Sequence, residues 1–214
     1  MRQRKIKNLD ERLAEFSQFI VEEPEKYRGR WREFFGNDRP IWLEIGCGKG
    51  KFITAHAARH PERNYIAIEG HESVVLRALE KAGEFSEDMR NLCFILEYVK
   101  DIRELFGDGE LAGIYLNFSD PWPKDRHAKR RLTYGKRLRQ YVQILQEDGA
   151  IAFKTDNDDL FEFTMEQIRQ EDMNVIELSR DLHRSSYNQE NITTEYEDKF
   201  AAVGKNINYV KFRA

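Results

Sequence analysis

The chain has 214 residues, of which 40% are hydrophobic and 34% charged, and its formal net charge is −3. This length fits one domain with a full core, and the acidic balance excludes nucleic-acid binding through overall charge alone. No apolar run approaches the length of a membrane span, and the basic residues 1–7 lack the apolar stretch of a secretory signal. We therefore expect a cytoplasmic protein, which agrees with two cysteines, Cys47 and Cys93, that show neither disulfide nor metal-ligand spacing.

Two regions are predicted, a basic and aromatic N-terminal arm (residues 1–39) packing on a larger domain (residues 40–214). The arm contains a predicted helix from residue 9 to about residue 21. In the larger domain, apolar runs alternate with helix-like segments, which indicates an α/β fold with a Rossmann-like, doubly wound, seven-stranded, mostly parallel sheet and helices on both faces. The predicted strands are 41–45, 64–69, 92–96, 114–116, 150–154, 175–178 and 207–212. The predicted helices are 51–59, 73–82, 102–105, 134–146 and 160–170.

The segment after the first predicted strand has a glycine pattern typical of nucleotide cofactor sites. Glu44 closes the strand and is followed by Gly46, Gly48 and Gly50, at the edge where open α/β sheets bind ligands. Glu69 ends the second strand, where it can accept both hydroxyls of a ribose. A plain turn would explain the glycines but not the two acids. A nicotinamide dehydrogenase would need G-x-G-x-x-G, and here the third glycine comes one residue early.

The fourth predicted strand breaks abruptly into the run N-F-S-D-P-W-P-K at residues 117–124. Prolines remove ladder donors and Asp120 is costly to bury unpaired, so this run does not continue the strand. Its Asn, Ser, Asp and Trp side chains suit a flat, nitrogen-rich ligand such as a nucleobase, although Trp122 could equally pack the loop. A basic run from Lys124 to Arg131 follows directly and suits a polyanion. The alternative for that run is an ordinary solvated surface.

These motifs together resemble the bacterial tRNA (guanine-N7)-methyltransferases, within the Rossmann-like S-adenosylmethionine-dependent methyltransferases. The matching blocks are E-x-G-x-G-x-G at 44–50, N-F-S-D-P-W-P-K at 117–124 with R-H-x-K-R-R-L at 126–132, F-K-T-D-N at 153–157, D-L-H at 181–183 and T-E-Y-E-D-K-F at 194–200. The resemblance runs from about residue 36 to residue 212. It implies methyl transfer from S-adenosylmethionine to N7 of a guanosine in the tRNA variable loop, at position 46 in tRNA numbering.

The resemblance also implies roles for particular residues. The cofactor site would contain Glu44, Gly46, Gly48, Glu69, Tyr98 and Asp120, with Asp120 also catalytic at the reaction centre. The RNA substrate would contact Lys124, Asp156, Thr194, Glu195, Tyr196 and Glu197. Tyr98, preceded by Glu97, stands where the family usually has Asp or a similar polar residue. The implied partner is tRNA, with no metal and no membrane, and the chain would act as a monomer or homodimer.

The implied chemistry places few demands on acid–base catalysis. Guanine N7 carries a free lone pair, so alignment and a negative group near the developing charge would suffice, and Asp120 suits both tasks. Two alternatives stay open. A non-catalytic RNA-binding protein on the same fold would lose the cofactor acids, yet Glu44, Glu69 and Asp120 are all present. A methyltransferase acting on another nucleobase position, such as an adenine amino group, would also use an Asp-Pro loop after the fourth strand.

Overall fold

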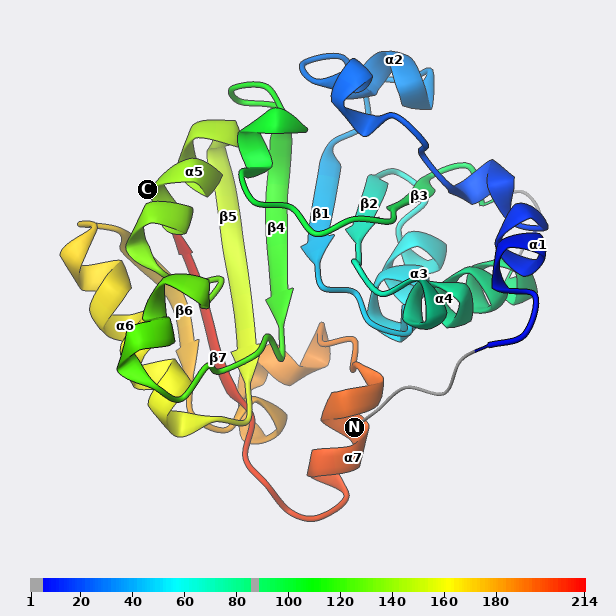
Figure 1. Ribbon diagram of the computed structural model, residues 1–214. Helices are drawn as coiled ribbons and strands as arrows, with labels where there is room; N and C mark the ends of the chain where they lie inside the picture. Colours follow the sequence, from blue (N-terminus) through cyan, green and yellow to red (C-terminus); the bar gives the residue numbers. More distant parts are fainter. Residues whose placement is uncertain (1–5, 86–88) are drawn as a thin grey trace.

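The computed structural model describes residues 6–85 and 89–214, so most of the basic N-terminal run, residues 1–5, lies outside it. The described residues form one seven-stranded sheet with helices on both faces (Figure 1). The strands are β1 (Ile41–Ile45), β2 (Asn64–Ile68), β3 (Leu92–Ile95), β4 (Leu111–Asn117), β5 (Leu145–Thr155), β6 (Asn174–Ser179) and β7 (Asn208–Arg213). The α-helices are α1 (Leu9–Ala14), α2 (Trp31–Phe35), α3 (Lys51–Arg59), α4 (Glu72–Phe85), α5 (Gly135–Ile144), α6 (Asp158–Gln170) and α7 (Glu195–Ala201). Short 3-10 helices are η1 (Ser17–Phe19), η2 (Pro24–Tyr27), η3 (Ile102–Glu104), η4 (Asp125–Arg130), η5 (Leu182–Arg184) and η6 (Ser186–Gln189).

The sheet order is β3-β2-β1-β4-β5-β7-β6, and β7 alone runs antiparallel to its neighbours in the described sheet. This confirms the predicted doubly wound, mostly parallel fold. The strand order reverses between β1 and β4, which pair in parallel with Glu44 opposite Tyr115. Because crossovers leave in opposite directions from these two strands, a crevice forms beyond their carboxyl ends. The glycine loop and the Asp120 loop both start at that edge.

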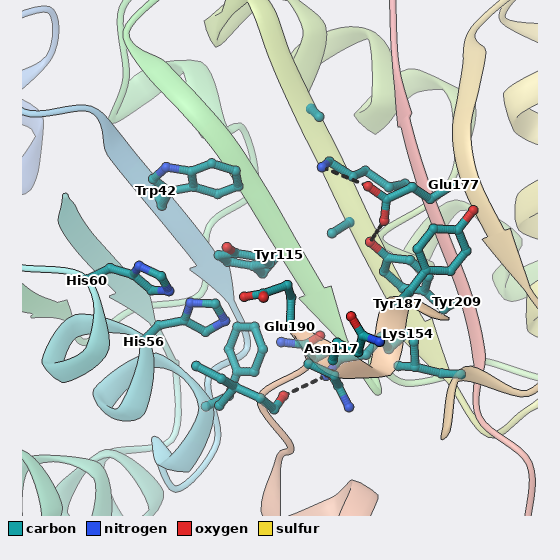
Figure 2. A pocket seen from close by; sticks show the side chains of 18 of the residues that line it. Trp42, His56, His60, Tyr115, Asn117, Lys154, Glu177, Tyr187, Glu190 and Tyr209 are labelled. Atoms are coloured by element: carbon teal, nitrogen blue, oxygen red, sulfur yellow. Dashed lines mark hydrogen bonds and ion pairs between the residues drawn. The ribbon is translucent and has the colours of Figure 1, made fainter. Parts of the chain in front are cut away.

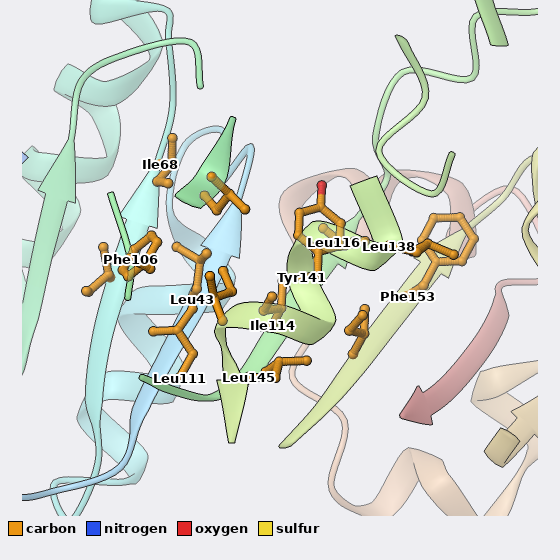
Figure 3. Packing of buried hydrophobic residues seen from close by; sticks show 14 of the residues in the cluster. Leu43, Ile68, Phe106, Leu111, Ile114, Leu116, Leu138, Tyr141, Leu145 and Phe153 are labelled. Atoms are coloured by element: carbon orange, nitrogen blue, oxygen red, sulfur yellow. The ribbon is translucent and has the colours of Figure 1, made fainter. Parts of the chain in front are cut away.

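Each face of the sheet buries its own apolar cluster. On one face, Leu43, Ile114 and Phe153 of the sheet pack against α5, where Leu138 and Tyr141 are buried (Figure 3). On the other face, helices α3 and α4 cover β1, β2 and β3 through a cluster that includes Tyr65, Phe94, Ile53 and Leu79. The near-continuous apolar strands that predicted a sheet covered on both sides are explained by these two layers.

The N-terminal residues 8–37 wrap around the β3 end of the sheet. Helix α1 packs on α4, and Val21 N donates to Phe94 O of β3 at 2.9 Å. Trp31 is fully buried, stacks on Phe106 and donates from Nε1 to Leu105 O at 2.9 Å. The predicted helix 9–21 was too long, since α1 ends at Ala14. Residues 20 and 21 must be extended to pair with β3, and a helix cannot supply that pairing.

The segment 181–204, for which no helix was predicted, contains η5, η6 and the seven-residue helix α7. A capping box starts α7: Glu197 N donates to Thr194 Oγ1, and the Glu197 side chain accepts from Thr194 N. The T-x-x-E signal for this helix start is present in the sequence and was missed. Residues 182–197 therefore form a continuous segment, here called the strap, that lies across the carboxyl edge of the sheet (Figure 1).

Candidate functional site

The glycine loop folds tightly between β1 and α3. Gly46, Gly48 and Gly50 all have positive φ angles, between 58° and 79°, which side chains with a Cβ rarely adopt. Gly50 is restricted further, because a Cβ there would lie 2.6 Å from Ala78 Cβ on α4. Gly46 N and Cys47 N both donate to Ile68 O at the end of β2. The glycines therefore bring the loop backbone close to the ends of β1 and β2.

Glu44 is a buried acid at the end of β1, 1% exposed. Its Oε1 accepts from Asn117 Nδ2 at 2.7 Å, while Oε2 is buried and reached by no donor from the described part of the chain. Burial raises the pKa of Glu44 to about 8, more than the Asn117 hydrogen bond and the charge of Lys154 lower it. A buried carboxyl oxygen with an unused lone pair, facing a glycine loop, is suited to a cationic donor from a ligand.

Glu69 and Tyr98 lie beside the same loop. Glu69 Oε2 accepts from Gly48 N at 3.2 Å and Oε1 from His71 N at 3.0 Å. The ring of Tyr98 lies against Gly70, where an added Cβ would come within 2.5 Å of it. Partial burial and the negative charges of Glu69 and Asp120 raise the pKa of Tyr98. The predicted residue Tyr98 therefore lies against Gly70, the residue that follows Glu69.

The loop that holds Asp120 has a strained backbone. Phe118 and Trp122, which flank it, have φ angles of 50° and 41°, rare for residues with large side chains. The strain is held by hydrogen bonds: Phe118 N donates to Lys154 O at 2.8 Å, and the Arg131 guanidinium donates to Pro121 O and Trp122 O. The exposed carboxylate of Asp120 is thus presented at the end of β4 by a loop fixed on both sides.

The basic run splits into two parts. Arg131 is buried, holds the Asp120 loop and stacks its guanidinium 4.3 Å from the Phe163 ring centroid. Arg130 covers the Trp122 ring at 4.7 Å, and His127 meets the same ring edge-on at 5.7 Å. Lys124 and Lys129 are exposed. Trp122 therefore packs the loop, and Arg131 is structural rather than available to a polyanion.

Helix α7 and its cap close one side of the crevice. Together with the glycine loop and the end of β4 they enclose a cavity of about 370 Å³, lined by Glu44, Gly46, Cys47, Gly48, Lys49, Val74, Asn117, Phe118, Thr194, Glu195, Tyr196 and Lys199. The half-exposed ring of Tyr196 lies 5.3 Å from the Phe118 ring. Six of the predicted site residues thus line one cavity: Glu44, Gly46, Gly48, Thr194, Glu195 and Tyr196.

Glu197 and Asp156 have other surroundings. Glu197 is fully buried, and its oxygens accept from Lys154 Nζ at 2.8 Å and Asn191 Nδ2 at 2.8 Å, with His183 Nε2 2.7 Å away. Burial would raise the pKa of Glu197, but Lys154 and these hydrogen bonds hold it below its usual value. Asp156 follows β5 and pairs with Lys205 at 2.8 Å, in a separate hollow with Asp158 and Arg180.

Sequence reasoning missed Asn117 and Lys154 as individual site residues, although both lie inside recognised motifs. Each is a polar residue at the end of an otherwise apolar strand, which was the available signal. Over residues 6–85 and 89–214, no three His, Cys, Asp or Glu side chains are grouped so as to hold a metal. In the same residues, no helix is long and apolar enough to cross a membrane.

This chain is similar to known methyltransferases in sequence and in fold. A family model described as "Putative methyltransferase" matches residues 38–210. The tRNA (guanine-N(7)-)-methyltransferase of Lachnoclostridium phytofermentans is 48% identical over 100% of this chain and 99% of its own length. The enzyme of the same description from Brevibacillus brevis is 47% identical over 97% and 95%. Among solved structures, an antibiotic related methyltransferase aligns with TM-score 0.60 at 14% identity, covering 85% of this chain and 90% of its own, a likeness of fold alone.

Proposed function

Since this chain belongs to that methyltransferase family, we propose that it transfers a methyl group from S-adenosylmethionine to N7 of a guanosine in tRNA, at position 46 of the variable loop. The single observation that carries the proposal is the 48% identity, over the whole chain, to a tRNA (guanine-N7)-methyltransferase. The site geometry supports it, because Glu44, the glycine loop and the rings of Phe118 and Tyr196 line one cavity at the switch point of the sheet.

The cofactor fits the residues around the glycine loop. S-adenosylmethionine supplies a methyl group on a positively charged sulfonium and carries an ammonium group and a ribose. Glu44 Oε2, buried and without a donor from the described residues, is suited to the ammonium group. Glu69 uses one lone pair of each oxygen on a backbone amide and keeps acceptor capacity for ribose hydroxyls. The ring of Tyr98, which packs against Gly70, offers an aromatic face to the adenine.

Asp120 is the proposed catalytic residue. Its carboxylate orients the guanine edge and stabilises the positive charge that develops on the purine as N7 is alkylated. A negative group is effective here only if it is held in place before the reaction. The strained Phe118 and Trp122 backbone, fixed by Arg131 and by Lys154 O, provides that fixation. The lone pair of N7 needs no base to expose it, so no further proton acceptor is assigned.

The substrate side of the site is proposed to consist of Lys124, Asp156, Thr194, Glu195 and Tyr196. Lys124 is exposed beside Asp120 and suits a phosphate, and Tyr196 can stack on an unpaired base. Glu197 is assigned a different role from the one the family resemblance implied. Because its oxygens already accept from several side chains in the interior, it positions residues 194–196 instead of contacting RNA.

The test is product analysis. The protein is incubated with unmodified tRNA and S-adenosylmethionine labelled in the methyl group, and the RNA is digested to nucleosides. Label in N7-methylguanosine is expected. Label in a methylated adenosine would favour the alternative of a methyltransferase acting on another base. Tight tRNA binding without any label would favour the non-catalytic RNA-binding alternative. The cytoplasm, where tRNA and S-adenosylmethionine occur together, is the compartment this function requires.

A further inference from the structure

A second cavity lies on the face of the sheet, next to the cavity that the glycine loop and α7 enclose. Its volume is about 390 Å³, at the small end of the range of about 300–1,000 Å³ typical of ligand pockets. Strands β1, β4, β5, β6 and β7 form its floor, helix α3 forms one wall, and residues 182–192 form the other (Figure 2). Asn117 lines both cavities, so the two are neighbours.

Aromatic rings border this cavity on two sides (Figure 2). On one side, Trp42 and Tyr115 stack with ring centroids 5.1 Å apart, and Trp42 occupies the space that a side chain at Gly113 would need. On the other side, Tyr187 and Tyr209 have ring centroids 5.8 Å apart. Between the two pairs the floor is made by Ala150 and Ala152 of β5, whose small side chains leave the space open.

A buried histidine also lines the cavity. His56 of α3 is 7% exposed, its ring centroid lies 5.0 Å from that of Tyr115, and no partner for its Nδ1 occurs among the described residues. Burial, with smaller effects from His60 and nearby cations, lowers the pKa of His56 to about 3. The imidazole is therefore neutral at physiological pH, with one donor and one acceptor nitrogen. His56 therefore adds an uncharged aromatic ring to the wall of the cavity.

The charges around the cavity are already balanced by ion pairs. Lys211 pairs with Glu177 at 3.1 Å, Lys154 with Glu197 at 2.8 Å and Arg59 with Glu190 at 3.3 Å. A phosphate would have to compete with these carboxylates, whereas a neutral planar ring would not. Aromatic faces combined with hydrogen-bonding edges are the features by which proteins hold unstacked RNA bases.

We propose that this cavity binds a second nucleobase of the RNA substrate, one that flanks the target guanosine, between the Trp42–Tyr115 and Tyr187–Tyr209 ring pairs. The inference rests on the proposed function, because it takes tRNA as the substrate. Asn117 lines both cavities, so a base held in the second one comes from a nucleotide close in the RNA chain to the target guanosine. Holding the neighbouring base would anchor the unstacked conformation in which the guanosine reaches Asp120.

The test is a double-mutant cycle on tRNA binding, measured as Kd so that it does not depend on N7 chemistry. One set of tRNAs carries an abasic site at either nucleotide flanking the target. The protein variants are Ala152→Leu, which fills the floor of the cavity, and Ala58→Leu, the same change at an exposed position of α3 outside it. Tyr187→Ala serves as a second cavity variant in case Ala152→Leu does not fold.

In the parent protein, one of the two abasic sites should weaken tRNA binding by roughly tenfold, the size expected for removing one base–aromatic stack. Ala152→Leu should weaken binding of intact tRNA by a similar factor, and the abasic site should then add less than about twofold. Ala58→Leu should behave as the parent. Equal abasic effects in parent and Ala152→Leu, or none in either, would overturn the inference. A protein that binds tRNA with the predicted coupling but yields no N7-methylguanosine would contradict only the proposed function.

Discussion

Lys154 Nζ lies 2.8 Å from Glu197 Oε2, and the two side chains are 5% and 0% exposed. The same ammonium group donates to Asn191 Oδ1 and to Ile192 O. This buried pair joins the middle of the sheet, at β5, to the strap that carries Thr194, Glu195 and Tyr196. The position of three proposed substrate residues therefore depends on one interior lysine.

Replacing Lys154 by Met should destabilise the fold strongly. The change leaves Glu197 buried without its counter-ion, which typically costs about 3–5 kcal/mol. The matched control is Lys51→Met, which removes the more exposed ion pair of Lys51 with Asp198, one residue beyond the strap, and should cost about 1 kcal/mol or less. Urea unfolding measures both free energies. Similar losses in the two variants would show that the buried pair has no special role.

Cofactor binding should release a proton through Glu44. Its pKa of about 8 in the free protein means that roughly 90% of the carboxyl groups are protonated at pH 7. An ammonium group placed beside Glu44 favours the carboxylate and lowers this pKa, so the proton leaves on binding. Calorimetry at pH 7 in buffers of different ionisation enthalpy should show nearly one proton released.

The control that assigns the released proton to Glu44 is the variant Glu44→Gln, which keeps the shape of the side chain and cannot titrate. Its binding should be weaker and should release far less than one proton. As pH rises through about 8 the free protein loses the proton by itself, so the release on binding should decline in the parent. An unchanged proton release in Glu44→Gln would assign the proton to another group.

Asp120→Asn should separate chemistry from RNA binding. Asn keeps the shape and one acceptor but loses the negative charge near N7, a loss that typically costs about a hundredfold or more in rate. The single-turnover rate of methyl transfer should fall by at least about that factor, while the Kd for tRNA stays nearly unchanged. Some cofactor affinity should also be lost, because the family resemblance places Asp120 in the cofactor site. A parental single-turnover rate would show that alignment alone carries the reaction.

Salt dependence should distinguish the two parts of the basic run. Reversing the exposed Lys124 and Lys129 to Glu should flatten the log–log salt slope of tRNA binding, by about 0.7–0.9 for each phosphate that the protein no longer neutralises. Arg131→Lys should leave that slope as in the parent, because Arg131 is buried on Pro121 O and Trp122 O, and it should instead lower the turnover rate. The control reversal is Arg39→Glu, at the opposite end of β1. Equal salt slopes of tRNA binding in the parent and all variants would show that Lys124 and Lys129 are ordinary solvated surface residues.

Much of this architecture was predictable because it follows from local patterns. Helix 51–59 and strand 41–45 were placed to the residue, since an apolar run ends at a glycine loop and a periodic segment follows it. The roles of Arg131 and Glu197 could not be predicted in this way. A sequence shows that Arg131 is charged, but only the folded chain shows that its guanidinium turns inward to two carbonyl groups.

Pairings between distant segments were equally hidden. Asn117 meets Glu44 across 73 residues, because the sheet order places the ends of β4 and β1 side by side. Lys154 of β5 meets Glu197 of α7 across 43 residues. The length of α1 was misjudged for the same reason: the pairing of Val21 with Phe94 overrides local helix propensity. Contacts between segments distant in the sequence therefore explain both the wrong length predicted for α1 and the site residues that were missed.

The most direct measurement of the central claim uses tRNA in which the guanosine at position 46 is replaced by 7-deazaguanosine. This analogue keeps the base-pairing edge and the shape of guanine but has a carbon in place of N7. If N7 is the acceptor, the analogue tRNA should bind with nearly parental Kd and accept no methyl group. Methylation of the analogue tRNA at the parental rate would contradict the account, because the methyl group would then be going to another atom.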